Sequence, residues 1–205
     1  MGAAVAVRDD LESAQARVSA SPAPPLVLAS QSPQRRAILE QLRIPFEVVL
    51  PTYEERGDDP LEHAAGKARS VDGGDRPVLG VDTVVLSDGR VLGKPRDSAE
   101  AEQTLETLAG RTHQVISGLC LRTQAWEELD SAATSVTFRP LTARDVANYV
   151  ATAEWEDRAG AYAIQGVGAS LVERIEGDYL NVVGLPAALL IRLLARRFSG
   201  IYGFG

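Results

Sequence analysis

Short apolar runs alternate with segments of helical periodicity from about Leu26 onward. Continuous apolar runs are typical of buried strands, whereas apolar residues three and four positions apart indicate helices. The pattern predicts strands at residues 26–29, 46–50, 77–86, 91–92, 112–123, 132–139 and 170–175. It predicts helices at residues 33–42, 61–71, 98–109 and 142–150, and a last helix from Pro186. Ser98 and Thr142 are expected to cap the third and fourth helices. This order, with hairpins between some strands, predicts an α/β fold with a mixed sheet.

The run from Pro77 to Leu86 is nearly all apolar, which is the pattern of a buried central strand. Asp82 interrupts it, and a carboxylate is costly to bury unless it is paired or faces a cation or a cleft. By strand alternation Asp82 shares a face with Gly80 and Val84, while Thr83 points the opposite way. A functional carboxylate and a structural one that closes a hydrogen-bond network both fit this position.

Composition favours one globular domain. The chain has 205 residues, 45% of them hydrophobic, which suits one domain, or one with a cleft between two lobes. Residues 1–24 are Ala- and Ser-rich, end in a Pro cluster and read as a flexible extension, with the domain spanning residues 25–205. The extension does not resemble a signal peptide, and we find no apolar run of about 18 residues that would form a transmembrane helix. We therefore expect a soluble cytoplasmic protein with no membrane partner.

Charge and metal-ligand residues exclude further classes of protein. A net charge of −7 argues against a partner that is a long nucleic acid, because such binders need a basic face. A single cysteine, Cys120, cannot form an internal disulfide, and its apolar neighbours place it in the core. Two distant histidines, His63 and His113, cannot complete a Cys/His zinc site, so a metal would be held mainly by oxygen atoms. His113 is expected to be structural.

The segment Ser30-Gln31-Ser32-Pro33-Gln34-Arg35-Arg36 combines a helix start with two cations. Ser32 suits the N-cap position and Pro33 the first helical position. Arginines in a first turn are opposed by the helix dipole, but they fit if an anion binds there. An ordinary capped helix with solvated arginines fits equally well.

Three further positions carry candidate chemistry. Lys94 precedes Pro95, which favours an extended backbone and a predictable direction for the side chain. Lys67 is a lone cation on a helix face of small residues. With Arg35 and Asp82, these lysines form a set that suits a polyphosphate and a divalent metal ion. Gln165 follows a Gly-containing segment, where its amide could read a planar base or simply bond the backbone.

The succession of motifs resembles the Maf family of nucleoside triphosphate pyrophosphatases from Leu26 to about Leu190. The matching blocks are LASQSPQRRAILEQL, FEVVLPTYEE, GKA, LGVDTVVL, LGKPRD, AGRTHQVISGL and WEDRAGAYAIQGVGASLVERIEGDYLNVVGLP. The resemblance implies an α/β fold with an elongated mixed sheet, flanking helices and two lobes around a central cleft, similar to inosine triphosphatases. It implies hydrolysis of a nucleoside triphosphate to a monophosphate and pyrophosphate with Mg²⁺, Mn²⁺ or another divalent cation. It also implies a homodimer.

The resemblance assigns roles residue by residue. Ser30, Ser32 and Arg35 match the family's phosphate-binding loop, and Glu55 matches its acidic residue after the second strand. Lys67, Asp82 and Lys94 match the helix lysine, the proton acceptor and the lysine of the GKP motif, which we take as catalytic residues. Glu55 and Asp82 are the expected metal ligands. The positions tied to the choice of base are Gln34, Thr83 and Gln165.

The DT and YxIQG motifs resemble the branch of the family that hydrolyses dTTP and UTP. The branch acting on 7-methyl-GTP typically has DQ where this chain has Asp82-Thr83. Gln34 stands where the dTTP/UTP branch usually has arginine, which leaves 7-methyl-GTP, CTP and modified pyrimidine triphosphates as alternative substrates. A nucleotide-binding regulator of septum formation, without hydrolysis, is an alternative of a different class.

Overall fold

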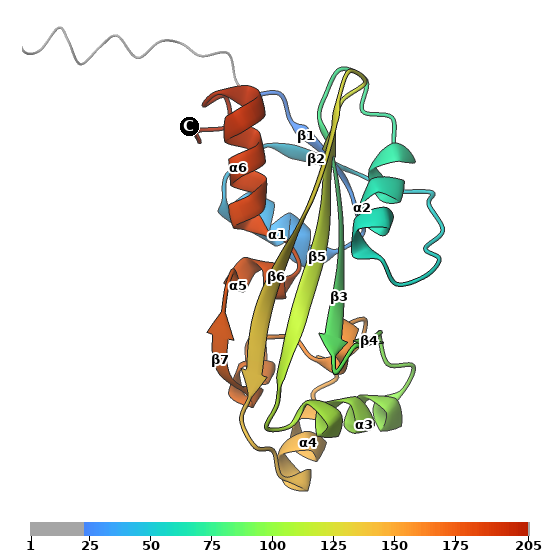
Figure 1. Ribbon diagram of the computed structural model, residues 1–205, viewed down its shortest axis with the longest axis vertical. Helices are drawn as coiled ribbons and strands as arrows, with labels where there is room; N and C mark the ends of the chain where they lie inside the picture. The colour runs from blue at the N-terminus through green and yellow to red at the C-terminus, as the bar shows by residue number, and fades with distance from the viewer. Residues whose placement is uncertain (1–22, 205) are drawn as a thin grey trace, which may run out of the picture.

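A seven-stranded mixed sheet forms the centre of the computed structural model, which describes residues 23–204 (Figure 1). The strands are β1 (Leu26–Ala29), β2 (Phe46–Val49), β3 (Val78–Ser87), β4 (Arg90–Leu92), β5 (Thr112–Arg122), β6 (Glu127–Phe138) and β7 (Val172–Glu176). The helices are α1 (Pro33–Gln41), α2 (Pro60–Arg69), α3 (Ser98–Leu108), α4 (Ala143–Val150), α5 (Tyr179–Val183) and α6 (Ala187–Phe198). The strand order is β2-β1-β3-β5-β6-β7, with β4 paired to β3 outside this path.

The direction of the strands changes at β3. β1 pairs in parallel with both β2 and β3, while β3, β5, β6 and β7 are successively antiparallel. The three long strands β3, β5 and β6 run along the length of the molecule (Figure 1). α1, α6, β1 and β2 lie toward one end of these strands, and α3, α4 and β4 lie at the other. The predicted elongated mixed sheet with flanking helices is confirmed.

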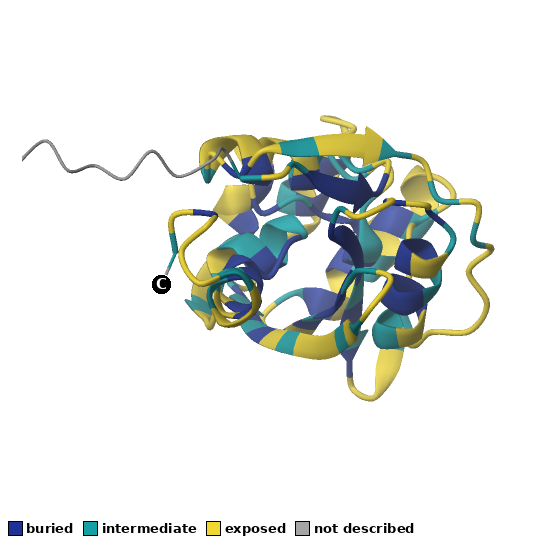
Figure 2. Ribbon diagram, turned by 90° about the horizontal axis from the view of Figure 1, so that it is seen from above, coloured by how far each residue is buried: buried dark blue, intermediate teal, exposed yellow. Residues whose placement is uncertain are grey.

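Two main hydrophobic clusters divide the molecule into two lobes. One cluster packs α1 and α6 on the sheet through residues such as Leu39 and Leu190. The other packs α3 and α4 through residues such as Leu105 and Phe138. β3 contributes Leu79 to the first cluster and Val85 to the second, so one strand passes through both lobes. Figure 2, seen along the long axis, shows the buried residues in the interior and the exposed ones on the outer faces.

α2 lies directly on the middle of the long strands because two glycines leave room for its backbone. A Cβ at Gly80 of β3 would lie 2.2 Å from the carbonyl oxygen of Ala64, and one at Gly118 of β5 would lie 2.2 Å from that of Pro60. Real Cβ atoms do not approach backbone so closely, so any side chain here would lift the helix from the sheet. This close packing places the buried side of α2 against β3.

The sequence pattern predicts most of these elements within a few residues. One cap is wrong: Asp97, not Ser98, caps α3, because its carboxylate accepts from the backbone N–H of Glu100 at 2.9 Å. Thr142 does cap α4, in a capping box with Asp145. The last strand begins later than predicted, at Val172, because residues 166–171 form a 3₁₀ segment. The short helix α5 is not predicted, and residues 1–22 of the predicted extension lie outside the described residues.

Candidate active site

A cleft of about 930 Å³ lies between the two lobes. Its walls come from the start of α1, the loop before α2, the middle of β3, the loop after β4 and the loop before the 3₁₀ turn at residues 159–161. Of the predicted site residues it is lined by Ser30, Ser32, Gln34, Arg35, Glu55, Lys67, Asp82, Thr83 and Lys94. Residues spread over 65 positions of the chain therefore meet at one place, as the motifs predict. Gln165 is absent from this lining and lies elsewhere.

Asp82 projects from β3 toward α2, where Lys67 meets it. The ammonium Nζ of Lys67 donates to Asp82 Oδ1 at 2.6 Å and lies 2.6 Å from Glu55 Oε1. Asp82 and Lys67 are each only 8% exposed, whereas Glu55 lies on the outer side of the pair. A buried carboxylate needs such a partner, and here one ammonium serves two carboxylates.

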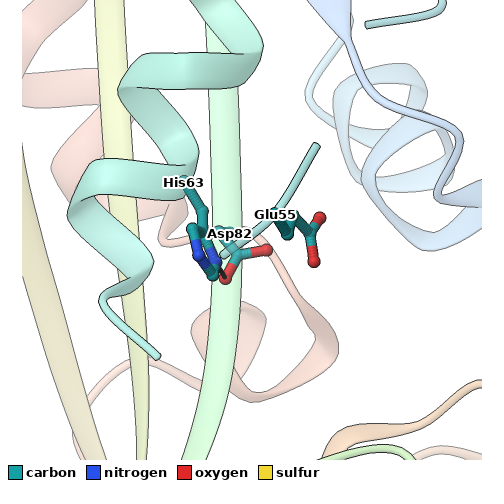
Figure 3. A group of neighbouring side chains, drawn as sticks. All are labelled: Glu55, His63 and Asp82. Carbon is teal, nitrogen blue, oxygen red and sulfur yellow. Dashed lines mark hydrogen bonds and ion pairs between the residues drawn. The ribbon is translucent and has the colours of Figure 1, made fainter. Parts of the chain in front are cut away.

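His63 is the site residue that the sequence reasoning misses. It lies one turn before Lys67 on α2, and its Nδ1 is 3.3 Å from Asp82 Oδ2. Its Nε2 lies 3.1 Å from the backbone carbonyl oxygen of Arg56. One ligand atom each of Glu55, His63 and Asp82 lies within 4.8 Å of the other two. Figure 3 shows that the three side chains come from the loop, the helix and the strand, with the His63 ring directed at Asp82. The available signal was the four-residue spacing from Lys67, which puts both on one helix face.

The loop that carries Glu55 is held against α2 by Tyr53. The Tyr53 ring covers Gly66, where an added Cβ would lie 2.3 Å from the ring, and it also lies 6.1 Å from the His63 ring between centroids. Asp59 then caps α2 by accepting from the backbone N–H of Leu61 at 2.8 Å. These contacts fix both ends of the loop and place Glu55 beside Lys67.

The opposite face of β3 carries a second polar network, centred on Arg35. Its guanidinium donates through Nη1 to Ser30 Oγ at 3.1 Å and through Nη2 to Thr83 Oγ1 at 3.3 Å. Its Nε donates to the carbonyl oxygen of Gly184 at 2.9 Å, and Thr83 Oγ1 lies 2.8 Å from Ser117 Oγ. The predicted alternation of Asp82 and Thr83 is confirmed, because the two residues face different helices and different partners.

The start of α1 decides between the two interpretations of its arginines. Ser32 is the N-cap, accepting from the backbone N–H of Arg35 at 3.4 Å, and Pro33 begins the helix as predicted. Arg36 is exposed, but Arg35 is only 9% exposed and is bonded on three sides. The picture of two solvated arginines is therefore wrong for Arg35, whose side chain forms part of the cleft wall.

Burial and charge shift the ionisation of two groups at the cleft. Burial lowers the pKa of the Arg35 guanidinium, an effect that the negative charges of Asp82 and Glu55 oppose. Partial burial of Glu55 works to raise its pKa, but the hydrogen bond and charge of Lys67 prevail and keep that pKa below its usual value. Glu55 therefore carries its negative charge at neutral pH, ready for a cation.

Lys94 lies on the opposite rim of the cleft from α2. Its side chain is exposed and its Nζ is 3.9 Å from a carboxylate oxygen of Asp157, a loose contact between two exposed groups. Its charge still contributes to lowering the pKa of Glu55. The structure thus brings Lys94 to the same cleft as Lys67, but on a wall that belongs to the other lobe.

A second, smaller pocket of about 220 Å³ holds the residue that the main cleft lacks. Gln165 lines it with Tyr179, and Gln34 and Val183 line both this pocket and the main cleft. The loop after Gln165 is braced by Glu154, whose carboxylate accepts from the backbone N–H groups of residues 167 and 168. Among the base-choice residues, Gln34 and Gln165 therefore come together, whereas Thr83 lies in the main cleft beside Arg35.

Two residues predicted to lie outside the site do so. His113 is buried among aromatic rings, with its Nε2 2.9 Å from the Tyr162 hydroxyl and its ring edge-on to Phe138. Burial lowers the pKa of His113 to about 4. Cys120 is fully buried, and burial raises the pKa of its thiol to about 12, so it is an inert core residue as predicted.

Comparison with known proteins identifies the family of the chain. The family model described as "Maf-like protein" matches residues 25–197, which include every residue of the cleft discussed above. The chain belongs to the Maf family. Among curated Maf relatives, a protein of Deinococcus radiodurans named dTTP/UTP pyrophosphatase is 45% identical over 194 residues, covering 91% of this chain and 98% of its own. A dTTP/UTP pyrophosphatase of Moorella thermoacetica is 48% identical over 181 residues, covering 83% and 93%.

The solved structure of the Ham1 protein of Staphylococcus aureus covers 56% of this Maf chain and 72% of its own at 14% identity, with a TM-score of 0.45, which is a slight likeness. Within residues 23–204, each helix is too short or too polar to cross a membrane.

Proposed function

We propose that this chain is a nucleoside triphosphate pyrophosphatase that hydrolyses dTTP and UTP to the monophosphate and pyrophosphate. The observation that carries the proposal is the buried Asp82 on the cleft floor, bonded to Lys67 and facing Glu55. A cleft that merely bound a nucleotide would gain nothing from a desolvated carboxylate beside an anionic ligand. The names and extensive coverage of the curated relatives support the same activity.

Arg35, Lys67 and Lys94, three cations that line the cleft, are the proposed binders of the triphosphate. Arg35 uses three of its five N–H donors on protein groups, which leaves two for phosphate oxygens and holds the side chain in one position. Lys67 and Lys94 approach from α2 and from the opposite rim. Together they would offset the charge that develops on the phosphoryl oxygens as the bond between the α- and β-phosphates breaks.

Asp82 is the proposed proton acceptor. The oxygen of a water molecule bonds to the α-phosphorus as the bond to the bridging oxygen breaks, and pyrophosphate leaves. The proton released by the water passes to Asp82, which the structure holds in place through Lys67 and His63. Ser30 and Ser32 complete the phosphate-binding loop at the start of α1.

The carboxylates of Glu55 and Asp82 suit a divalent cation such as Mg²⁺ or Mn²⁺. Mg²⁺ keeps several waters and needs only one or two carboxylates, which matches this pair. Both belong to the group whose ligand atoms lie within 4.8 Å of one another. When bound, the cation would withdraw negative charge from the triphosphate and so favour attack by water.

Gln34 and Gln165 are the proposed readers of the base. Both line the smaller pocket, which adjoins the main cleft through Gln34 and Val183. An amide offers a donor and an acceptor, the pattern needed to recognise the edge of a pyrimidine. Thr83 is the third position that the resemblance ties to the choice of base, but it lies in the main cleft and bonds Arg35, so its proposed role is to hold that arginine.

A nucleotide panel tests this function. Purified full-length protein with Mg²⁺ is given dTTP, UTP, CTP, 7-methyl-GTP and modified pyrimidine triphosphates, and pyrophosphate release is measured. Preference for dTTP and UTP is the expected result, and preference for another member of the panel would refute the substrate assignment. Tight nucleotide binding without pyrophosphate release would instead favour a regulator.

Gln34→Arg tests the choice of base separately from catalysis. The variant should change the ratio of kcat/KM for dTTP to that for CTP or 7-methyl-GTP, because residue 34 lines both pockets. Gln103→Arg, on the exposed side of α3, is the matched control and should leave the ratio unchanged.

A homodimer in the cytoplasm is the proposed working form, and light scattering of the purified protein tests the dimer.

A further inference from the structure

The contacts of the two His63 ring nitrogens direct Nδ1 at the carboxylate of Asp82. A backbone carbonyl oxygen only accepts, so the 3.1 Å contact with Arg56 O requires the proton on His63 Nε2. Nδ1 then faces Asp82 Oδ2 at 3.3 Å, and a carboxylate oxygen only accepts. A positive charge between these two atoms satisfies both of them, and either a proton on Nδ1 or a metal ion bound to its lone pair supplies that charge.

The same arrangement is the usual one for a histidine that binds a metal ion. Metal-ligating histidines commonly donate their other ring N–H to a backbone carbonyl, which fixes the tautomer and the direction of the lone pair. His63 is 4% exposed and its position on α2 is fixed by the close packing of the helix on β3. His63 Nδ1 therefore faces Asp82 (Figure 3), and one ligand atom each of Glu55, His63 and Asp82 lies within the 4.8 Å that one cation can bridge.

The ammonium of Lys67 does not occupy this position. Lys67 contacts Asp82 through Oδ1 and Glu55 through Oε1, whereas His63 faces the other oxygen of Asp82, Oδ2. Asp82 thus divides its two oxygens between the lysine and the histidine. A cation can share Oδ2 with Nδ1 while Lys67 keeps its bond to Oδ1.

From these contacts we propose that His63 Nδ1 is a third protein ligand of the divalent cation, alongside Glu55 and Asp82. This inference rests on the proposed metal-dependent function. A nitrogen ligand changes the preference of the site, because imidazole binds late first-row cations well, whereas Mg²⁺ prefers oxygen. The mixed nitrogen and oxygen set favours Co²⁺ over Mg²⁺.

Pulsed electron paramagnetic resonance of bound Mn²⁺ tests the ligand directly. The chain has two histidines, His63 and His113, and His113 is buried among aromatic rings in the other lobe. Imidazole ¹⁴N coupling to Mn²⁺ in untagged full-length protein, without nucleotide, therefore reports His63. We expect this coupling, and bound Mn²⁺ that lacks it overturns the proposal without requiring any variant to fold.

His63→Gln provides the second measurement. The variant should lose the ¹⁴N coupling and bind Co²⁺ about 10- to 100-fold more weakly, with a smaller loss for Mg²⁺. Arg56→Ala is the matched control, because it removes an exposed side chain but keeps the carbonyl that bonds His63. A thermal melt of each variant checks folding. An unchanged Co²⁺ affinity in His63→Gln overturns the proposal.

The inference and the proposed function can fail separately. If His63 only orients Asp82, the wild type shows no ¹⁴N coupling and His63→Gln weakens Co²⁺ and Mg²⁺ binding by the same factor. That result overturns the proposal that His63 binds the cation, while the proposed release of pyrophosphate is unaffected. If the nucleotide panel yields no pyrophosphate, the proposed function fails, and the coupling still decides whether His63 binds the cation.

Discussion

The two histidines of this chain are buried to nearly the same extent, 4% and 2% exposed, in opposite surroundings. His63 lies between an aspartate and a backbone carbonyl at the edge of the cleft. His113 lies among Phe138 and other aromatic residues, with the Tyr162 hydroxyl as its polar neighbour and no hydrogen-bond partner within residues 23–204 for Nδ1. The region around His63 therefore buries charged groups, whereas the region around His113 is built from aromatic rings.

This contrast separates function from stability. The cleft region holds several buried polar groups in fixed hydrogen bonds, an arrangement that stabilises the fold little but prepares a charged site. The aromatic region gains its stability from burying large rings. Conservative changes in the cleft that keep the shape of the side chain should therefore lower activity more than the free energy of unfolding, and changes around His113 should do the reverse.

The largest expected effect is that of Asp82→Asn. Loss of the proton acceptor should reduce kcat by about 10³-fold, roughly 4 kcal/mol, while the amide keeps the shape of the side chain. Pyrophosphate release measures the activity, and circular dichroism measures the melting temperature. Asp88→Asn, in the exposed β3–β4 turn, is the control and should retain full activity. Wild-type turnover in Asp82→Asn would remove Asp82 from the mechanism.

The next effect concerns the aromatic region at acid pH. Folded His113 has a pKa of about 4, below its ordinary value near 6.5, so the unfolded chain binds the extra proton between these values. Stability is therefore complete above about pH 6.5 and falls as the pH drops toward 4, by at most about 3 kcal/mol from this residue. Urea unfolding at several pH values measures this loss.

His113→Gln sharpens that measurement, because glutamine can still bond the Tyr162 hydroxyl but does not titrate. Its unfolding free energy should depend less on pH between 4 and 6.5 than that of the wild type. Equal slopes for both proteins would contradict the assignment. Activity at neutral pH should be unchanged in a folded variant, which keeps the two regions distinct.

Arg35→Lys comes third. A lysine keeps the charge but cannot bond Ser30, Thr83 and Gly184 at once, so the phosphate-binding position is lost. We expect kcat/KM to fall about 10- to 100-fold, or about 1.4 to 2.7 kcal/mol. Arg36→Lys, on the exposed side of α1, should have no effect. Equal activities of the two variants would mean that charge alone is required.

Thr83→Val has the smallest expected effect. The substitution removes the hydroxyl between Arg35 and Ser117. It should reduce kcat/KM for all nucleotides by a similar factor, equivalent to about 1 kcal/mol in activation free energy. The nucleotide panel measures this change. A change for dTTP that is absent for CTP would show that Thr83 reads the base rather than supporting Arg35.

The fold could be predicted from the sequence where local pattern and packing agree. The apolar run of β3 and the capping residue Thr142 of α4 indicate their elements directly. The 3₁₀ segment at residues 166–171 could not be predicted, because its backbone depends on Glu154, which holds two of its N–H groups from 13 and 14 positions away. The N-cap of α3 is Asp97 and not its neighbour Ser98. Both residue types are favoured at an N-cap, so sequence preference alone does not decide between them.

The candidate site could be predicted from local motifs but not from its contacts. Arg35 and Asp82 stand out because each breaks a local rule, a cation in a first turn and a carboxylate in an apolar strand. The partner Gly184 lies 149 positions from Arg35 and has no local signal. His63 was missed because a lone histidine on a helix is more often structural, and only the tertiary contact with Asp82 distinguishes it.

The strands β3, β5 and β6 run without interruption through both hydrophobic clusters. This continuity determines how the two lobes on either side of the cleft unfold. Leu79 and Val85 anchor one strand in both lobes, so neither lobe can detach without breaking the central ladder. Backbone amides around Asp82 should therefore be among the slowest to exchange with solvent hydrogen. The two lobes should unfold as one cooperative unit, and on heating, activity and structure should disappear together.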